Sequence, residues 1–263
     1  MEPLNTCDRA SLTDIRFVLC DMDDTLTLDG KLPAKTYSAL EDLQSNGIQV
    51  VVVTGRPAGW CDLIARLWPV SAVVGENGAF YFAYDQKSRT MVQKYQRDEE
   101  QRERDRIELF SHLSDLQKAH PHIVLSADQP YRISDIAIDF CEDVPAWKDE
   151  EVQNISNELA DKGVTVKISS IHINAWMGNF SKLEMAQALL SDRMNMTEQE
   201  MLSSCVYVGD SPNDEPMFAH FPHSVGVANV RQYEKSMTHL PRWITEKPGG
   251  YGFSELSDLL LAR

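Results

Sequence analysis

A short apolar segment that ends in a cluster of carboxylates is the feature that most constrains this chain. Residues Phe17–Cys20 are apolar, and Asp21, Asp23 and Asp24 follow before Thr25. Apolar runs of this length, bounded by polar residues, are typical of buried strands in parallel sheets. Open α/β sheets bind their ligands at the carboxyl ends of such strands. The carboxylates therefore lie either in a ligand site or in a solvated acidic turn, and the rest of the chain must decide.

Alternating strands and helices follow this segment. Residues 48–53 form a β-branched run, and residues 72–74 form a third short apolar run. Helical spacing of apolar residues begins after Pro33 and again after Pro57, and proline favours the first turn of a helix. This order of elements indicates βαβ units and a parallel sheet. Beyond the Asn77-Gly78 turn, residues 79–84 and 90–95 are expected to form a β-hairpin.

Residues 97–176 differ in composition and are expected to form a separate small α+β unit. A dense charged run, residues 97–106, opens it. Such a run suits either a nucleic-acid patch or a solvated helix face, and its near balance of acids and bases favours the helix face. One strand, a helix that ends at Gly163, and strands over 164–168 and 171–176 follow. Residues 1–96 and 177–263 would then form one discontinuous core domain.

The alternation of strands and helices returns after Gly178. A helix is expected over residues 181–190, then strands over 205–208 and 224–227. Ser254 is a candidate N-cap for a last helix. Polar residues now fall at strand ends or helix starts in four places, namely Asp21 with Asp23, Thr54, Lys182, and Asp210 with Asp214. Each has a local structural explanation, as a cap, a surface lysine or a turn, but their joint occurrence in one order is far less probable.

Together these residues resemble the haloacid dehalogenase (HAD) superfamily of phosphohydrolases. The likeness rests on Asp21-x-Asp23-x-Thr25, a strand that ends in Thr54, a lysine at the head of a helix, and Gly209-Asp210-x-x-x-Asp214. The amino-acid sequences of residues 74–79 and 209–214 are most similar to those of the Cof-like subclass, IIB. The resemblance implies a Rossmann-like parallel sheet with an α+β cap inserted between the second and third motifs. Asp24 departs from the pattern, because many members have glycine there.

The resemblance also implies roles for the motif residues. Asp21 would be the nucleophile that forms an aspartyl-phosphate, and Asp23 the general acid and then the general base. Carboxylates around a phosphate require a hard cation, and Mg²⁺ suits a set of oxygen ligands. That set comprises Asp21, the backbone carbonyl of Asp23, Asp210 and Asp214.

Further residues are candidates for contacts with the phosphoryl group. Thr54 offers a hydroxyl, Gly55 lies among the amide donors near it, and Lys182 supplies positive charge between the phosphate and Asp21. Asn77 is a further candidate. Asn213 resembles a phosphate-contacting position, although a turn residue would look the same.

The inserted unit is expected to select the substrate. His172, Asn174 and Trp176 alternate with apolar residues and so share one face of a strand. That face could line a sugar pocket or be an ordinary half-exposed strand face. Arg56 and Arg132 are candidates for binding a second anionic group of the substrate.

The sequence thus predicts a Mg²⁺-dependent phosphohydrolase acting on a small phosphate monoester, such as a sugar or glycosyl phosphate. One alternative is a phosphosugar mutase of the same superfamily, and a second is a non-catalytic binding protein with the same fold. The absence of membrane-length apolar stretches in the sequence argues against an ATP-driven pump.

Net charge and cysteine spacing narrow the expected partners. A formal charge of −15 argues against non-specific nucleic-acid binding and against an anionic membrane surface. The five cysteines are widely spaced, without a Cys-x-x-Cys pair, which fits reduced thiols and a cytoplasmic location. The expected partner is a small phosphorylated metabolite, and the oligomeric state stays open.

Overall fold

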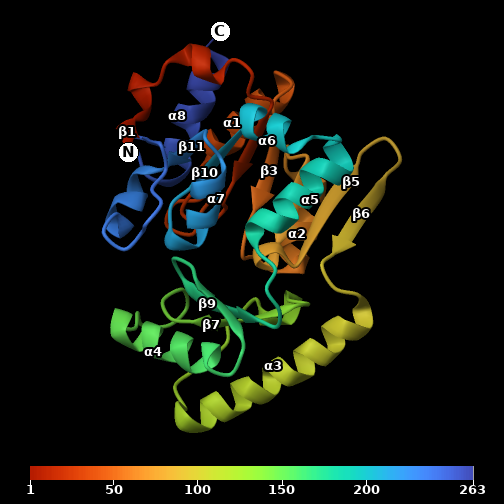
Figure 1. Cartoon of the computed structure of the whole chain (residues 1–263), viewed down its shortest axis with the longest axis vertical. Helices are drawn as coiled ribbons and strands as arrows, with labels where there is room; N and C mark the ends of the chain where they lie inside the picture. The colour runs from red at the N-terminus through yellow and green to blue at the C-terminus, as the bar shows by residue number, and fades with distance from the viewer. Residues whose placement is uncertain (263) are drawn as a thin grey trace.

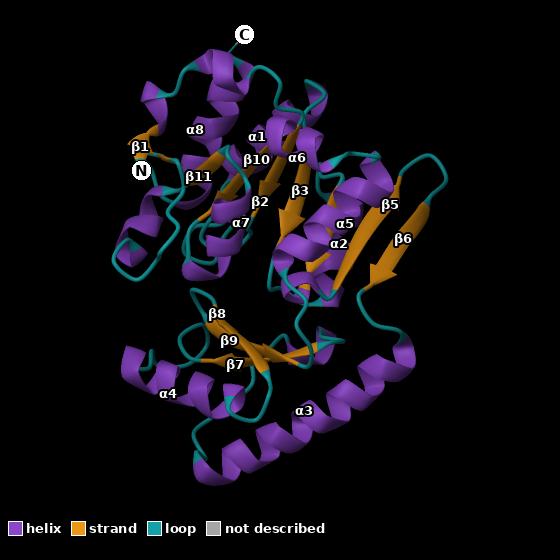
Figure 2. Ribbon diagram, in the orientation of Figure 1, coloured by secondary structure: helices purple, strands orange, loops and turns teal. Residues whose placement is uncertain are grey.

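The chain forms two sheets with helices packed on them in the computed structural model, which describes residues 1–262 (Figure 1, Figure 2). The strands are β1 (Glu2–Pro3), β2 (Phe17–Cys20), β3 (Gln49–Val53), β4 (Ala72–Gly75), β5 (Phe80–Asp85), β6 (Thr90–Tyr95), β7 (Asp135–Asp139), β8 (Thr165–Ile168), β9 (His172–Trp176), β10 (Cys205–Gly209), β11 (Ser224–Gly226) and β12 (Trp243–Ile244). The α-helices are α1 (Ala34–Ser45), α2 (Ala58–Leu67), α3 (Glu99–Ala119), α4 (Asp149–Ala160), α5 (Lys182–Met194), α6 (Glu198–Ser204), α7 (Glu215–His220) and α8 (Gly249–Leu261).

The larger sheet has the strand order β1-β12-β11-β10-β2-β3-β4-β5-β6. Every pair from β1 to β4 is parallel, whereas β5 and β6 form an antiparallel hairpin on the edge, as predicted. Strand β2 lies between β10 and β3, so three predicted motif strands are neighbours. Their carboxyl ends therefore bring the residues that follow each strand to one edge of the sheet.

Alternate residues of the central strands pack on opposite layers of helices. Val18 and Cys20 of β2 belong to the hydrophobic cluster that contains the buried residues of α1, α2 and α8. Phe17 and Leu19 belong to the second cluster, with α5, α6 and α7. Because side chains alternate along a strand, a strand covered on both faces must be apolar throughout, which accounts for the unbroken apolar run of β2.

The smaller sheet is antiparallel, in the order β7-β9-β8, and it has a hydrophobic core of its own. Helices α3 and α4 supply Leu109, Leu113 and Ile155 to that core, against Ile138 and Ile173 of the sheet. This part lies across the carboxyl ends of the parallel strands (Figure 1). The predicted fold class is thus confirmed as an α/β parallel-sheet core with an inserted α+β cap. The charged run before Leu109 lies on α3, as predicted for a helix face.

The prediction that Ser254 caps the last helix is wrong. Helix α8 begins at Gly249, and the Ser254 hydroxyl donates a hydrogen bond to the Gly250 carbonyl inside the helix. The two glycines permit this earlier start, because a Cβ on Gly249 would lie 2.4 Å from the Thr27 carbonyl oxygen and one on Gly250 would lie 1.9 Å from the hydroxyl oxygen of Thr36. The short elements β1, β12, α6 and α7 were not predicted. None of the described helices has the length and apolar character that crossing a membrane would need.

Candidate active site

Lys182 joins two of the predicted motif carboxylates. It is the first residue of α5, after Ser181, whose hydroxyl caps the helix by accepting a hydrogen bond from the Glu184 amide. Its ammonium lies 3.1 Å from Asp21 Oδ1 and 3.0 Å from Asp214 Oδ1, and its side chain is only 5% exposed. Burial opposes the charge, but the two carboxylates outweigh that effect and raise the pKa of Lys182. The lysine is therefore a charged group of the site and not a surface residue.

The helix start that carries Lys182 is positioned by the turn after β4. A Cβ on Gly78 would lie 2.0 Å from the Ser181 carbonyl oxygen, and Gly78 has a φ of +106°. Only glycine allows both this close approach and this conformation without strain. The Asn77-Gly78 signal thus predicted a turn correctly, and the fold uses that turn to place the lysine beside Asp21.

Asp21, Asp210 and Asp214 form a buried carboxylate cluster, whose oxygens lie within 4.8 Å of one another. Burial raises the pKa of Asp21 to about 7, with Lys182 opposing and Asp214 and Asp23 adding to the increase. Burial, then Asp214 and Asp21, raise the pKa of Asp210 as well. Like charges gathered in this way favour a bound cation, and a set of carboxylate oxygens fits a hard divalent ion such as Mg²⁺.

The cluster is held rigidly by neighbouring donors. Asp214 accepts hydrogen bonds from the Tyr207 hydroxyl at 2.5 Å and from the Asp210 amide at 3.0 Å. Asp210 accepts from the Thr25 hydroxyl at 2.9 Å and from the Asn229 amide group at 3.2 Å. The capped turn considered for Asp210 and Asp214 is thus present, and the same turn builds the carboxylate cluster.

Asp24, the position that departs from the family pattern, has a φ of +56°. This left-handed conformation explains why glycine is common there, and aspartate is one of the few other residues that tolerates it. The departure therefore leaves the turn between Asp23 and Thr25 intact.

A small pocket of about 10 Å³ lies beside Asp21. Its lining includes Asp21, Asp23, Gly55, Arg56, Ser169, Ser170, Ile171, His172, Asn174 and Asn213. Thr54 is fully buried, and its hydroxyl accepts a hydrogen bond from the amide of Arg56, a lining residue, at 3.0 Å. The Asn77 side chain lies against Gly55, where an added Cβ would be 3.1 Å from its Nδ2 atom. The predicted candidates therefore converge, with the exception of Trp176.

The three residues predicted to share a face of β9 do so, because Ile173 and Ala175 between them point into the core of the cap, but only two of the three line the pocket. His172 and Asn174 line the pocket, and both are buried. Trp176 stacks on Phe180 with ring centroids 5.5 Å apart and belongs to the core cluster, so within residues 1–262 it does not line this pocket. The alternative of a half-exposed strand face is wrong for all three, because none exceeds 2% exposure.

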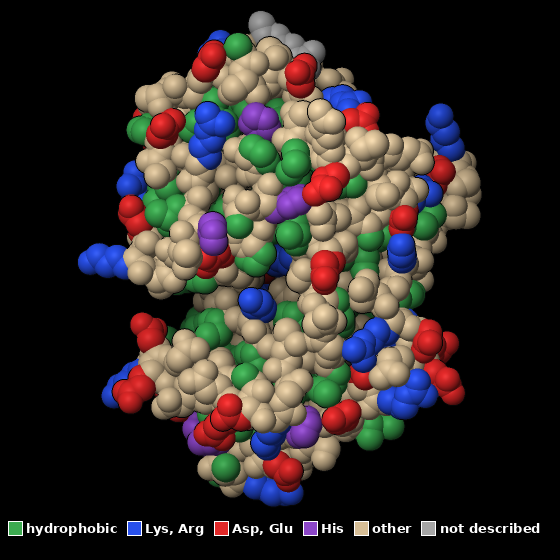
Figure 3. Space-filling model, viewed as in Figure 1, with side chains coloured by type: hydrophobic (Ala, Val, Ile, Leu, Met, Phe, Trp, Pro, Cys, Tyr) green, Lys and Arg blue, Asp and Glu red, His purple; other side chains and the backbone are tan. Residues whose placement is uncertain are grey.

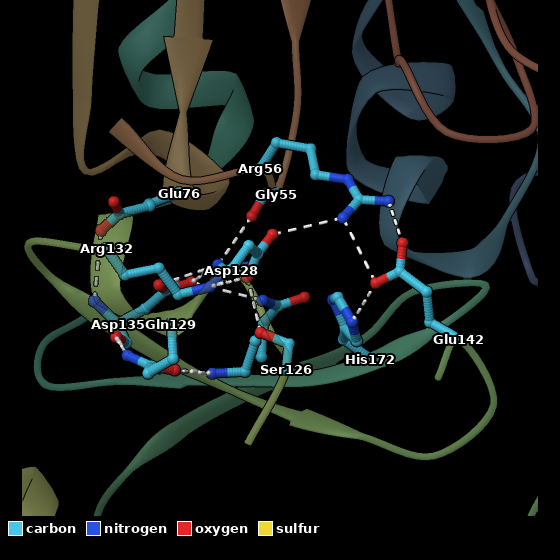
Figure 4. A network of polar contacts seen from close by, with 12 residues as sticks. Gly55, Arg56, Glu76, Ser126, Asp128, Gln129, Arg132, Asp135, Glu142 and His172 are labelled. Atoms are coloured by element: carbon cyan, nitrogen blue, oxygen red, sulfur yellow. Dashed lines mark hydrogen bonds and ion pairs between the residues drawn. The ribbon is translucent and has the colours of Figure 1, made fainter. Parts of the chain in front are cut away.

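Arg56 connects Asp23 to the cap. Its guanidinium donates two hydrogen bonds of 2.9 Å to Asp23. It also donates one of 3.2 Å to Asp128 and one of 2.6 Å to Glu142 (Figure 4). The Glu142 carboxylate also lies 2.8 Å from His172 Nε2. Arg56 is thus surrounded by three carboxylates, one from the core and two from the cap, in place of the substrate anion for which it was a candidate.

Arg132, the other candidate for a substrate anion, makes a second connection between cap and core. Its guanidinium donates hydrogen bonds to Asp128 at 3.0 Å, to Asp135 at 3.0 Å and to the Gly55 carbonyl at 2.9 Å (Figure 4). Glu76 of the core is buried and accepts hydrogen bonds from the Ile133 and Ser134 amides of the cap. The cap is therefore fixed over the strand ends by buried charges, at the level where the surface is hollowed between the two parts (Figure 3).

Sequence reasoning missed Glu76, Asp128 and Glu142. Each lies in a loop or turn outside the periodic segments, and only Glu76 belongs to a motif that the sequence singled out, residues 74–79. No local signal relates Asp128 or Glu142 to Arg56, because the contact depends on how the cap is placed on the core.

We expect the Glu142 contacts to make stability depend on acid pH. Partial burial opposes ionisation of Glu142, but contacts with His172 and Arg56 outweigh it and lower its pKa from 4.5 to about 2. A lowered carboxyl pKa stabilises the fold above the unfolded value, and this contribution is lost as pH falls from about 4.5 to about 2. At pH values above about 4.5, the unaltered protein should therefore have a higher urea midpoint than Glu142→Gln. As the pH falls from about 4.5 to about 2, the two midpoints should converge. Exposed Glu103→Gln is the control, and a midpoint difference independent of pH would contradict the assignment.

Comparison with known proteins gives a family match over part of the chain and a likeness in fold over nearly all of it. Residues 18–135 match the haloacid dehalogenase-like hydrolase family. Comparison with curated protein sequences finds no match. Among solved structures, a putative HAD/COF-like hydrolase from Plasmodium vivax is similar with a TM-score of 0.69 at 17% identity, covering 97% of this chain and 99% of that chain.

Two further similar structures are described as sugar phosphatases. A HAD subclass IIB sugar phosphatase has a TM-score of 0.61 at 12% identity, covering 92% of this chain and 97% of its own. A sucrose-phosphatase from Synechocystis sp., solved with sucrose and phosphate, has a TM-score of 0.58 at 15% identity. The match covers 94% of this chain and 98% of the sucrose-phosphatase chain. At these identities the likeness concerns the fold, and it extends over nearly the whole chain, cap included. Residues 18–135 thus match the haloacid dehalogenase-like hydrolase family, and the fold of nearly the whole chain is similar to that of solved HAD-like hydrolases.

Proposed function

We propose that this protein is a Mg²⁺-dependent phosphohydrolase that cleaves a small phosphate monoester through an aspartyl-phosphate on Asp21. The observation that carries the proposal is the buried Lys182 ammonium, 3.1 Å from Asp21 and 3.0 Å from Asp214, beside the carboxylate cluster. A phosphoryl group needs a nucleophile and positive charge close together, and this arrangement supplies both.

Asp21 is the nucleophile in this proposal. Its side chain accepts a hydrogen bond of 2.8 Å from the Met22 amide and faces Lys182, so its position is held from two sides. A carboxylate oxygen of Asp21 attacks phosphorus, and the bond from phosphorus to the leaving oxygen breaks. Water then attacks the phosphorus of the aspartyl-phosphate, which releases inorganic phosphate and restores the carboxylate.

Asp23 is the general acid in the first step and the general base in the second. It donates a proton to the leaving oxygen and then accepts one from the attacking water. Its side chain is 20% exposed, and Arg56 now binds both of its oxygens. Because Arg56 occupies both carboxyl oxygens of Asp23, substrate binding must loosen this pair before Asp23 can contact the leaving oxygen.

Asp21, Asp210, Asp214 and the backbone carbonyl of Asp23 are the proposed metal ligands. When bound there, Mg²⁺ supplies Lewis-acid neutralisation of the phosphoryl oxygens and favours the ionised form of its carboxylate ligands. Thr54, the Gly55 amide, Lys182, Asn77 and Asn213 are the proposed phosphate contacts.

Residues 97–176 are the proposed cap domain, with 1–96 and 177–263 as the core domain. We propose a sugar or glycosyl phosphate as substrate, because His172 and Asn174 of the cap line the pocket and two similar structures are described as sugar phosphatases. All five cysteines are free thiols, which supports a cytoplasmic location.

Replacing His172 by alanine is expected to raise KM for the natural sugar phosphate more than KM for phenyl phosphate. His172 contacts Glu142 at 2.8 Å and faces the pocket, so it should bind the part of the substrate that phenyl phosphate lacks. Loss of one hydrogen bond to a substrate corresponds to roughly tenfold in KM. Steady-state kinetics on both esters provide the measurement, and an equal change in both KM values would refute the role of His172.

A panel of phosphate esters, assayed for free phosphate with Mg²⁺ and with a chelator, tests the proposed function. Phosphate release that requires Mg²⁺ supports a phosphohydrolase. Isomer formation without net phosphate release would identify a phosphosugar mutase. Binding of esters without either reaction would identify a non-catalytic binding protein.

A further inference from the structure

An aromatic cleft of about 490 Å³ lies where helix α2 meets the cap. Its walls come from the catalytic loop, from α2 and from the 3-10 helix η4 (Gln129–Tyr131) of the cap. The lining residues are Met22, Gly59, Trp60, Leu63, Ile64, Trp68 and Tyr131. Trp60 is 37% exposed, Leu63 51% and Tyr131 58%, so large apolar side chains face solvent here. Volumes of this size hold small organic ligands.

The cleft is built jointly by the core and the cap. A Cβ on Gly59 would lie 3.0 Å from the Tyr131 Cβ atom, so the absence of a side chain at Gly59 lets Tyr131 approach α2 closely. The cap position that closes the active site therefore also sets the width of the cleft.

The cleft and the candidate active site adjoin each other at two residues, Met22 and Arg56. Met22 lines it and stands in the chain between Asp21 and Asp23, which both line the catalytic pocket. The Arg56 guanidinium lies 4.5 Å from the centre of the Trp60 ring, while the same group binds Asp23. Arg56 is thus the boundary between the two spaces, with the general acid on one side and the indole on the other.

The volumes of the two spaces limit where a ring beyond the phosphorylated unit of the substrate can lie. The catalytic pocket, about 10 Å³, has room for no more than about one water molecule. Asp23 protonates the leaving oxygen, so the leaving group must start beside Asp23 and extend away from it. The Arg56 guanidinium binds Asp23 and lies over the Trp60 ring, so the neighbouring space on the indole side of Arg56 is the aromatic cleft.

We propose that this cleft is a subsite for the distal part of the leaving group, a ring with an apolar face that stacks on Trp60 and Tyr131. The proposal rests on the phosphohydrolase function above. A second sugar ring and an aromatic ring share this chemistry, because both present an apolar face to an indole or phenol. The preferred substrate is accordingly a phosphate monoester whose phosphorylated unit carries a further ring.

Two matched ester pairs test the subsite. Glucose 6-phosphate is compared with trehalose 6-phosphate, and phenyl phosphate with biphenyl-4-yl phosphate. The protein should prefer the two-ring member of at least one pair by roughly tenfold in kcat/KM, the value of one stacked ring. Preference in the first pair identifies a sugar ring, and preference in the second an aromatic ring.

Trp60→Ala and Tyr131→Ala should each reduce that two-ring preference severalfold. The matched control is Leu67→Ala, which removes an exposed apolar side chain from the same helix but outside the cleft, and it should keep the preference. If the ratio of kcat/KM for the two-ring ester to that for the one-ring ester is the same in the unaltered protein and in both cleft variants, the proposal is overturned. So would a Trp60-dependent dimer in solution without any change in preference, because a second copy would then occupy the cleft.

A binding measurement separates failure of the subsite from failure of the proposed function. Calorimetric titration of biphenyl-4-yl phosphate and trehalose 6-phosphate into Asp21→Asn needs no turnover. If no ester is hydrolysed by the unaltered protein, the proposed function is wrong. Binding by Asp21→Asn is then compared with binding by the double variant Asp21→Asn/Trp60→Ala. If the two proteins have the same affinity for each two-ring ester, the subsite is wrong as well. If the double variant binds either ester roughly tenfold more weakly, the subsite is supported.

Discussion

Asp21→Asn is expected to lower kcat by at least about a thousandfold without reducing stability. The amide cannot act as the nucleophile, so no aspartyl-phosphate forms. Burial raises the pKa of Asp21 to about 7, which means that its negative charge is costly in the folded protein without metal. The neutral amide removes that cost, while Lys182 keeps Asp214 as a partner at 3.0 Å.

Phosphate release on the best ester and the urea midpoint without metal measure the two effects. Exposed Asp42→Asn on helix α1 is the matched control and should change neither. A midpoint well below that of the unaltered protein would show that the activity loss reflects unfolding. Activity within about tenfold of the unaltered protein would refute the nucleophile assignment.

Lys182→Met is expected to destabilise the metal-free protein by about 3–5 kcal/mol, the usual cost of removing one partner of a buried ion pair. The variant leaves the carboxylates of Asp21, Asp210 and Asp214 together without their cation, within 4.8 Å of one another. Mg²⁺ supplies a cation to the same oxygens, so added MgCl₂ should recover part of the lost stability. Phosphatase activity should fall as well, because the phosphoryl group loses a fixed positive charge.

Urea unfolding with and without MgCl₂ provides the measurement, with exposed Lys162→Met as the control. A small loss of stability would mean that the Lys182 pair is solvated and weak. An equal loss with and without MgCl₂ would contradict the assignment of the carboxylate cluster as the cation site.

The convergence of the motif residues was predictable because it follows from chain topology. Asp21, Thr54 and Asp210 each follow an apolar strand, and parallel neighbours present their carboxyl ends at one edge. Lys182 was predicted at a helix start, and the structure places it as the first residue of α5. Such predictions need only the order of the elements and the direction of the strands.

Short elements and exact helix starts were harder to predict. The Ser254 assignment failed because serine is common both at caps and inside helices, whereas the true start depends on the contacts of Gly249 and Gly250 with Thr27 and Thr36, distant in sequence. Strands β1 and β12 have two residues each and pair only with each other and with β11, so their hydrophobic pattern is too short to recognise.

The sequence by itself determined the βα core, the inserted unit and the candidate residues of the catalytic chemistry, because each depends on local periodicity and on residue type at a strand end. Only the tertiary structure decided what surrounds them. It paired Arg56 with Asp23, Asp128 and Glu142, sent Trp176 into the core while His172 and Asn174 face the pocket, and opened an aromatic cleft beside Trp60. These features depend on how the cap lies on the core. That placement is the sum of many contacts between distant residues, and no segment of the chain carries it alone.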